Sequence, residues 1–244
     1  MRLLLLILFL LSRAAFAQFN DTTNYYINYT STGVINKTND GNSHVLNNNL
    51  RFSISKKRVS FNTTNFLIYG KQQGNLSNND FTSAADLNVY NKGSRRKFYY
   101  WGLLQYESSF SLKLHHRLQT GVGIGYNIID KPNVVVILSD GILYEKSNLY
   151  NDAESVRNDY ETFRNSFRVK FRWVIRDIIT LDGSDFLQHA LDDGSDYIIK
   201  SNTNLSVKLL KWLSVTASVT YNKLNKTRRE NLLVNYGLTF ERYF

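Results

Sequence analysis

Apolar and polar residues alternate along most of this chain, and the alternation continues over long stretches. Successive side chains of a β-strand point to opposite faces, so alternation predicts strands with one apolar face and one polar face. After Gln18, no apolar run approaches the ~20 residues that a membrane-spanning helix needs. The clearest alternating stretch begins at Trp212, and its apolar positions are Leu213, Val215, Ala217, Val219 and Tyr221.

These stretches are longer than the strands of an ordinary soluble sheet. Several reach ~12 residues, whereas soluble strands usually have about 5–6 and a tilted transmembrane strand needs about 9–11. An unpaired backbone group in lipid costs several kcal/mol, so a membrane sheet has to close on itself. We therefore predict an all-β fold, a closed antiparallel up-and-down transmembrane β-barrel of about twelve strands, with ten strands as the alternative. The expected strands span residues 24–35, 42–55, 59–71, 79–91, 96–107, 112–128, 133–146, 159–174, 177–188, 196–208, 212–223 and 230–243.

Short and longer connections alternate between these strands. The even-numbered connections are short, at residues 56–58, 91–95, 130–132, 174–176 and 209–211. The odd-numbered ones are mostly longer and polar, at residues 36–41, 72–78, 147–158, 182–195 and 224–229, with a short exception at 108–111. Outer-membrane barrels have tight periplasmic turns and longer external loops. The pattern therefore predicts that both chain ends lie in the periplasm.

The N-terminus has the pattern of an export signal. Arg2 precedes an apolar run at residues 3–11, and Ala15-Phe16-Ala17 fits a small-residue cleavage site. The apolar run is about half the length of a spanning helix, which argues against a membrane anchor. We predict a signal peptide at residues 1–17 and a single barrel domain at 18–244, located in the outer membrane of a Gram-negative bacterium.

The polar faces of the strands supply the candidate functional residues, which we expect to line the barrel interior. Basic residues outnumber acidic ones in this set by seven to two, so a water-filled interior would favour anions. The alternative is a packed interior in which the charges form an ion-pair network, since unpaired buried charges are costly. The candidates are Arg51, Asp86, Arg117, Gln119, Arg168, Lys170, Arg172, Lys200, Lys208 and Glu241.

Composition and motifs argue against an enzyme. The chain has 244 residues, 14% aromatic residues, a formal charge of +10 and no Cys, which excludes disulfides, Cys zinc sites and thiol nucleophiles. No Ser-His-Asp arrangement with suitable spacing is present, and we expect no cofactor. Gly121, Gly123 and Gly125 share the inward face of a strand, where they leave space for bulky residues instead of holding a nucleotide.

Two further motifs bear on metal binding. Asp182-Gly183-Ser184-Asp185 and Asp193-Gly194-Ser195-Asp196 form an acidic stretch that fits either plain turns or an external calcium site. His115 and His116 are adjacent on an expected strand. We therefore expect their side chains to point to opposite faces, so that they cannot hold one metal ion. We interpret them, with His44 and His189, as surface residues.

Several short motifs resemble the salt-induced outer-membrane protein family, also called domain of unknown function 481. The resemblance covers about residues 25–240 and implies a barrel fold, an outer-membrane location and no settled reaction. Ser108 and Ser109 stand where the family often has an acidic residue, which argues against a cation site at that rim. The matching motifs are 29–33 (Tyr-Thr-x-x-Gly), Tyr106-Glu107, 120–126 (Gly-x-Gly-x-Gly-Tyr), 211–215 (Lys-Trp-Leu-Ser) and the closing strand 236–240.

The C-terminal strand and the charge suggest partners. The strand ends at Phe244 and resembles the signal that the outer-membrane assembly machinery reads, although Arg242 departs from that pattern. The positive charge suits outer-membrane lipids and lipopolysaccharide, while no basic and aromatic patch for nucleic acid is evident.

A narrow pore for small or anionic solutes, with a stress-related role, is the expected function. The alternative is a secreted soluble β-barrel that binds a small ligand in its mouth. Aromatic residues near strand ends fit interfacial girdles: Tyr99, Tyr100, Trp101, Tyr106, Tyr126, Tyr144, Trp173, Trp212 and Tyr243.

Overall fold

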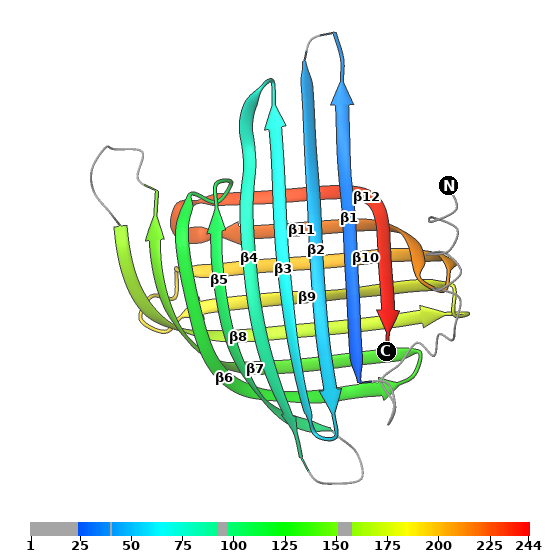
Figure 1. The fold of residues 1–244 in the computed structure, drawn as a ribbon. Helices are drawn as coiled ribbons and strands as arrows, with labels where there is room; N and C mark the ends of the chain where they lie inside the picture. Colours follow the sequence, from blue (N-terminus) through cyan, green and yellow to red (C-terminus); the bar gives the residue numbers. More distant parts are fainter. Residues whose placement is uncertain (1–23, 40, 92–96, 151–157) are drawn as a thin grey trace.

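A computed structural model describes residues 24–39, 41–91, 97–150 and 158–244, which form a closed β-barrel (Figure 1). Each strand pairs antiparallel with its neighbours in the chain, so the predicted twelve-stranded up-and-down barrel is confirmed and the ten-stranded alternative is wrong. The predicted signal peptide, residues 1–17, lies outside the described residues. The elements are β1 (Tyr25–Lys37), β2 (Asn42–Lys56), β3 (Val59–Gln72), β4 (Asn75–Tyr90), β5 (Phe98–Ser109), β6 (Leu114–Lys131), β7 (Val134–Leu149), β8 (Asn158–Ile175), β9 (Ile179–Ala190), β10 (Tyr197–Leu210), β11 (Leu213–Leu224), the short 3₁₀ helix η1 (Asn225–Thr227) and β12 (Arg229–Tyr243).

The barrel closes where the first strand meets the last. The backbone N–H of Tyr25 donates to the carbonyl of Phe244 at 2.8 Å, and the N–H of Phe244 donates back at 3.0 Å. Closure removes the free sheet edges that hydrocarbon surroundings do not tolerate. In Figure 1, strands β1 to β4 of one wall cross β8 to β11 of the other at a steep angle, as expected of strongly tilted strands. No helix among the described residues has the length and apolar character needed to cross a membrane.

The connections follow the predicted alternation only in part. The connection predicted at 72–78 is a tight turn at Gln73 and Gly74, whose positive φ angles of 51° and 79° suit a two-residue hairpin. The asparagines that suggested a loop extend β4 instead. Conversely, β5 begins at Phe98, two residues later than predicted.

The connection predicted at residues 182–195 is also wrong. Residues 182–185 belong to β9, and the turn occupies residues 191–196. Asp182 lines the interior cavity, whereas Asp185 has the opposite parity on the same strand and lies on the outer wall. The two acidic motifs therefore do not form one external loop.

A β-bulge interrupts the regular alternation at the start of β6. Leu114 pairs with Leu149 and His116 pairs with Asn148, so His115 is an extra residue between two consecutive positions of β7. The ladder between β5 and β6 is irregular at the same place. A bulge bends its strand and changes the direction of the side chains beside it.

The bulge corrects the expected positions of the two adjacent histidines. Leu114 and Arg117 are both buried inside the barrel although they are three residues apart, which regular alternation does not allow. Between them, His115 and His116 lie with their Nδ1 atoms 3.1 Å apart. The expectation that these two side chains point to opposite faces is therefore wrong.

The outer wall of the barrel is apolar over most of its area. Val122, Phe163 and Trp173 expose 69%, 56% and 52% of their surface. Contiguous apolar surface of this extent is absent from typical soluble monomers, and it fits contact with lipid.

A few polar side chains on the outer wall bond to one another across neighbouring strands. Ser31 donates to Asn48 at 3.0 Å, and Asn165 donates to the carboxylate of Asp140 at 2.9 Å. A partner of this kind offsets part of the cost of a polar group that faces lipid. Asp140 and Asp185 are acidic residues on this otherwise largely apolar wall.

The glycines of β6 make room for aromatic rings inside the barrel, as predicted. A Cβ atom on Gly123 would lie 2.4 Å from the ring of Trp101, and one on Gly125 would lie 2.1 Å from the ring of Tyr99. Both rings line the cavity. The absence of a Cβ atom on these glycines lets the rings pack directly against the backbone of β6.

We predict that Gly237→Ala destabilises the barrel at its closing seam. A Cβ atom there would lie 1.9 Å from the backbone oxygen of Ser31 on β1, so β1 and β12 have to separate. Overpacking of this kind costs about 1–3 kcal/mol, measured as a lower free energy of unfolding in urea by tryptophan fluorescence. Gly194→Ala is the matched control, since nothing lies within 4 Å of its added Cβ. Equal stability of the two variants would contradict the prediction.

Candidate functional site: the barrel interior

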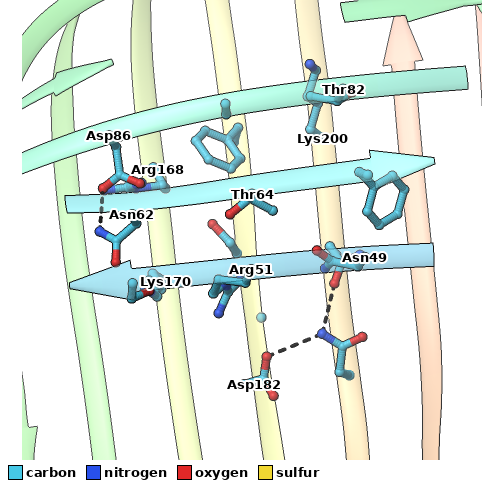
Figure 2. Close-up of a pocket in the computed structure, with 18 of the residues that line it drawn as sticks. Asn49, Arg51, Asn62, Thr64, Thr82, Asp86, Arg168, Lys170, Asp182 and Lys200 are labelled. Carbon is cyan, nitrogen blue, oxygen red and sulfur yellow. Dashed lines mark hydrogen bonds between the residues drawn. The ribbon is translucent and has the colours of Figure 1, made fainter. Parts of the chain in front are cut away.

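A cavity of about 610 Å³ lies inside the barrel, mainly against β2 to β5 and β8 to β10 (Figure 2). On β4 its lining reaches from Asp80 to Tyr90. This separation corresponds to about 33 Å along a strand, and to about 25 Å along the barrel axis at a strand tilt near 40°. The apolar band of an outer-membrane barrel is about 25 Å tall, so the cavity extends over the depth of the spanning wall.

The structure places the candidate residues in two groups. Arg117 and Gln119 are fully buried in a packed part of the interior. The other eight line the cavity, and they are Arg51, Asp86, Arg168, Lys170, Arg172, Lys200, Lys208 and Glu241.

The cavity lining carries three carboxylates that the sequence analysis did not place there. They are Asp80, Glu107 and Asp182. With these, six cations face five carboxylates, so the expected excess of seven basic to two acidic residues is wrong. Asp80 has the same parity as Asp86 on β4, so alternation could have found it. Asp182 was missed because its Asp-Gly-Ser sequence resembles a turn.

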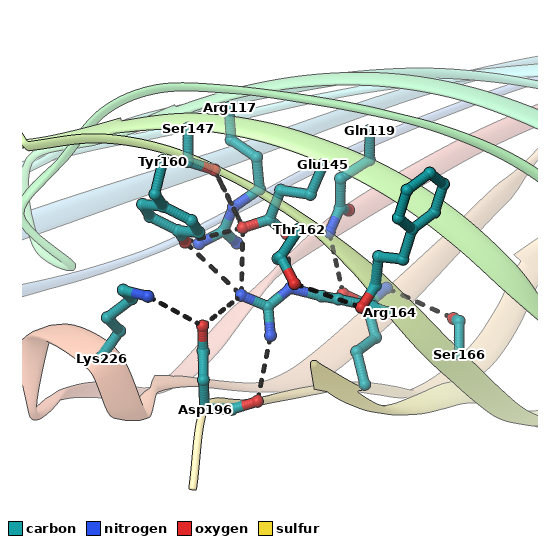
Figure 3. A network of polar contacts seen from close by, with 12 residues as sticks. Arg117, Gln119, Glu145, Ser147, Tyr160, Thr162, Arg164, Ser166, Asp196 and Lys226 are labelled. Atoms are coloured by element: carbon teal, nitrogen blue, oxygen red, sulfur yellow. Dashed lines mark hydrogen bonds and ion pairs between the residues drawn. The ribbon is translucent and has the colours of Figure 1, made fainter. Parts of the chain in front are cut away.

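The packed part of the interior is built around the carboxylate of Glu145 on β7 (Figure 3). Arg164 Nε donates to Glu145 Oε2 at 2.7 Å, and Arg117 Nε lies 3.4 Å from Oε1. Tyr160 and Gln119 each donate to the same carboxylate at 2.7 Å. Glu145 and Arg164 are 0% exposed, and Arg117 is 1% exposed. The charges are thus held entirely by protein groups.

The network also joins strands that are not neighbours. Lys200 on β10 lies 2.6 Å from the Glu107 carboxylate on β5, and Gln119 on β6 donates to Gln188 on β9 at 3.0 Å. Arg164 also forms an ion pair with Asp196, the residue directly before β10, at 2.9 Å. These contacts cross the interior, so this side of the barrel is closed by side chains.

Apolar side chains complete the packed side at the same end of the barrel. They come from the β5–β6 turn and the adjoining ends of β6, β7, β10 and β11, and Tyr160 packs against them. The cluster is buried and excludes water from the interior between the charge network and this end of the barrel. Its members are Leu112, Leu114, Leu149, Ile198 and Leu224.

Glu145, Arg164 and Asp196 were not among the interior residues predicted from the sequence. Arg164 lies four residues before Arg168 and shares its inward parity, so the alternation of β8 contained the signal. Asp196 was interpreted as a turn residue, and nothing in its local sequence indicates a buried partner on β8. The alternative of a packed ion-pair interior therefore describes one side of the barrel, and a cavity occupies the other.

The cavity leaves several cations without protein partners. Among the described residues, the side chains of Arg51, Lys170 and Lys208 form no hydrogen bond or ion pair, whereas every lining carboxylate accepts at least one hydrogen bond. Asp86, for example, accepts from Asn62 at 2.9 Å (Figure 2). Arg168 is positioned by Ser139, to which its Nε donates at 3.0 Å. The charges available to a solute are therefore mainly positive.

The contacts at residues 191–196 are those of a hydrogen-bonded turn and not those of a cation site. Asp193 Oδ1 accepts the backbone N–H of Ser195 at 2.9 Å and its hydroxyl at 2.7 Å. These hydrogen bonds hold the pKa of the Asp193 carboxyl below its ordinary value. Asp196 points inward to Arg164 and Lys226. No group of three or more His, Asp or Glu residues suited to a metal ion occurs in the described part of the chain.

Comparisons with known proteins agree with this fold. A family model described as "Protein of unknown function, DUF481" matches residues 31–240. The chain is similar in fold to the NanC porin, with 11% identity and a TM-score of 0.50 over 87% of this chain and 98% of the porin. It is also similar to the COG4313 outer membrane channel from Pseudomonas putida F1, with 10% identity and a TM-score of 0.50 over 96% and 100% of the two chains. No curated protein matches the chain.

We predict that Glu145→Gln destabilises the barrel strongly, because it leaves Arg117 and Arg164 buried without their shared counter-charge. Breaking a buried pair in this way costs about 3–5 kcal/mol. Glu161→Gln is the matched control, since its pair with Lys146 is exposed and is worth less than about 1 kcal/mol. The free energy of unfolding in urea measures both. A loss at Glu145 no larger than that at Glu161 would contradict the structural role of the network.

Proposed function

The chain belongs to the DUF481 family, described as proteins of unknown function, and we propose that it is an outer-membrane channel of a Gram-negative bacterium. The observation that carries the proposal is a polar cavity that extends over the depth of an apolar-walled barrel. Such a barrel stands in lipid while its interior stays hydrated. Its role is transport, not catalysis.

The packed side limits what can pass. Eight-stranded barrels are filled by their own side chains, and diameter grows with strand number. Here the Glu145 network and the leucine-rich cluster fill one side of a twelve-stranded barrel. The remaining path is narrower than an empty barrel of this size, so it suits small hydrophilic solutes.

The lining supports a modest preference for anions. Charged side chains in a narrow pore set its selectivity. The lining carboxylates accept hydrogen bonds from the wall, while the side chains of Arg51, Lys170 and Lys208 form no hydrogen bond or ion pair within the described chain. Since cations exceed carboxylates by only six to five in the lining, the preference is weaker than the basic sequence suggests.

The second candidate is a secreted soluble barrel with a ligand in its mouth, and the interior cavity is consistent with it too. It is disfavoured by the apolar outer wall, where residues such as Val122 and Phe163 are exposed. Washing bacterial envelopes with alkaline carbonate separates the two candidates. A membrane protein stays in the pellet, while a soluble one is released.

The chain end supports assembly into the outer membrane. Phe244 stacks on Tyr25, with ring centroids 5.7 Å apart, and lies half exposed on the outer wall at the seam. We propose that the strand ending at Phe244 is read by the outer-membrane assembly machinery. Outer-membrane lipids and lipopolysaccharide then surround the wall.

We predict that the purified protein forms small channels in planar bilayers and that the reversal potential in a salt gradient shows anion preference. The double substitution Arg51→Ala and Lys170→Ala removes two unpaired cations, so the preference falls to parity or below. Lys211→Ala, in the exposed β10–β11 turn, is the control and leaves selectivity unchanged. An absence of conductance in the wild type contradicts the channel, and an unchanged preference in the double variant contradicts the role of these cations.

The resemblance to salt-induced proteins leads us to propose a stress-related role as well. We predict that transcript and protein levels rise when the host is moved to high external salt. Quantitative RNA measurement, with an unrelated outer-membrane barrel as control, tests this. Unchanged levels contradict the salt response without affecting the channel.

A further inference from the structure

The β-bulge of β6 places two imidazole rings side by side at one end of the barrel. His115 and His116 have their Nδ1 atoms 3.1 Å apart, and their ring centroids are 5.3 Å apart. His115 is exposed and His116 is half-buried. The pair lies beside the β5–β6 turn, outside the cavity, and plays no part in the channel.

From this geometry we propose that His115 and His116 chelate a divalent transition-metal ion through their Nδ1 atoms. Imidazole nitrogen binds such ions at about 2.0–2.1 Å. Two nitrogens at that bond length and 3.1 Å apart subtend about 98° at the metal. This angle lies between the right angle of square-planar or octahedral coordination and the tetrahedral angle, so the separation needs no adjustment.

The bulge makes this chelate possible. On a regular strand, adjacent side chains point to opposite faces, and one metal ion could not reach both rings. The extra residue puts both histidines between the inward-facing Leu114 and Arg117. Because Leu114 is anchored in the apolar cluster and Arg117 in the charge network, the backbone that carries the rings is fixed from both sides.

The contact in the metal-free protein is a hydrogen bond in which one Nδ1–H donates to the other Nδ1. Binding requires both rings to carry their proton on Nε2, so one proton moves from Nδ1 to Nε2 of the donating ring. No net proton is released if both rings start neutral. Both Nδ1 lone pairs are then free to bind the metal ion.

The site is a two-ligand chelate completed by water, since no third His, Asp or Glu joins it within the described residues. Imidazole ligands suit copper, nickel and zinc, and among divalent ions copper binds most tightly. Copper(II) also accepts cis nitrogens near a right angle, so it is the ion we expect to bind best. The nearby ring of Tyr150, 5.1 Å from that of His115, covers one side of the pair.

The test uses the full-length mature protein in detergent, purified without a histidine tag, and titrates it with copper(II). Isothermal titration gives the affinity and stoichiometry, and electron paramagnetic resonance detects nitrogen coordination. We expect one equivalent bound with nitrogen couplings, and an affinity at least tenfold weaker in His115→Ala and in His116→Ala alike. His189→Ala is the control and leaves binding unchanged, because that ring lies on β9 with Tyr197.

Three results overturn the proposal: no stoichiometric copper binding by the wild type, copper affinity unchanged from the wild type in both variants, or loss of binding in only one of them. The last result would show a single-histidine site. Unfolding in urea checks that each variant is folded, and both histidines lie outside the packed core, so we expect stability to be unchanged. His115→Gln retains a polar side chain without an imidazole and separates loss of the ligand from loss of the bulge.

Discussion

The structure depends on the requirement that every strand pair its backbone on both edges. In this chain the requirement is met only when β1 reaches β12, and the two ends of the described chain exchange hydrogen bonds between Tyr25 and Phe244. Once the sheet is closed, alternation along each strand separates an apolar outer wall from a polar interior. The apolar outer wall and the enclosed cavity are both consequences of that closure.

The interior then has to satisfy its own charges. Glu145 is surrounded by Arg117, Arg164 and Tyr160 without access to water, and a charge in such a place is stable only with partners of this kind. The contact between Glu107 on β5 and Lys200 on β10 links opposite walls on that side. The cavity is therefore the part of the interior that the network does not fill. Arg51, Lys170 and Lys208 line this unfilled part, so they are out of reach of the network and remain unpaired.

A single extra residue in β6 connects these features. Without His115, Leu114 and Arg117 could not both point inward, and either the apolar cluster or the charge network would lose a member. Bulges change side-chain direction at the rims of barrels. Here the bulge serves packing inside the barrel and, as a result, places two histidines together outside it.

The sequence by itself determined the barrel, its twelve strands and the face of each long strand. Alternation is a local property, so the inward positions of Arg168, Lys170 and Arg172, and the room that Gly123 leaves for a ring, could be predicted from neighbouring residues alone. Tertiary structure decided which charges are paired. Asp196 meets Arg164, and Lys200 meets Glu107, only because strands distant in sequence face each other across the closed interior. It also decided the direction of His115 and His116, because a one-residue bulge reverses the alternation on which the sequence prediction rests. Local patterns fix the face on which a side chain lies, but its partner depends on the distance between walls, which no local pattern contains.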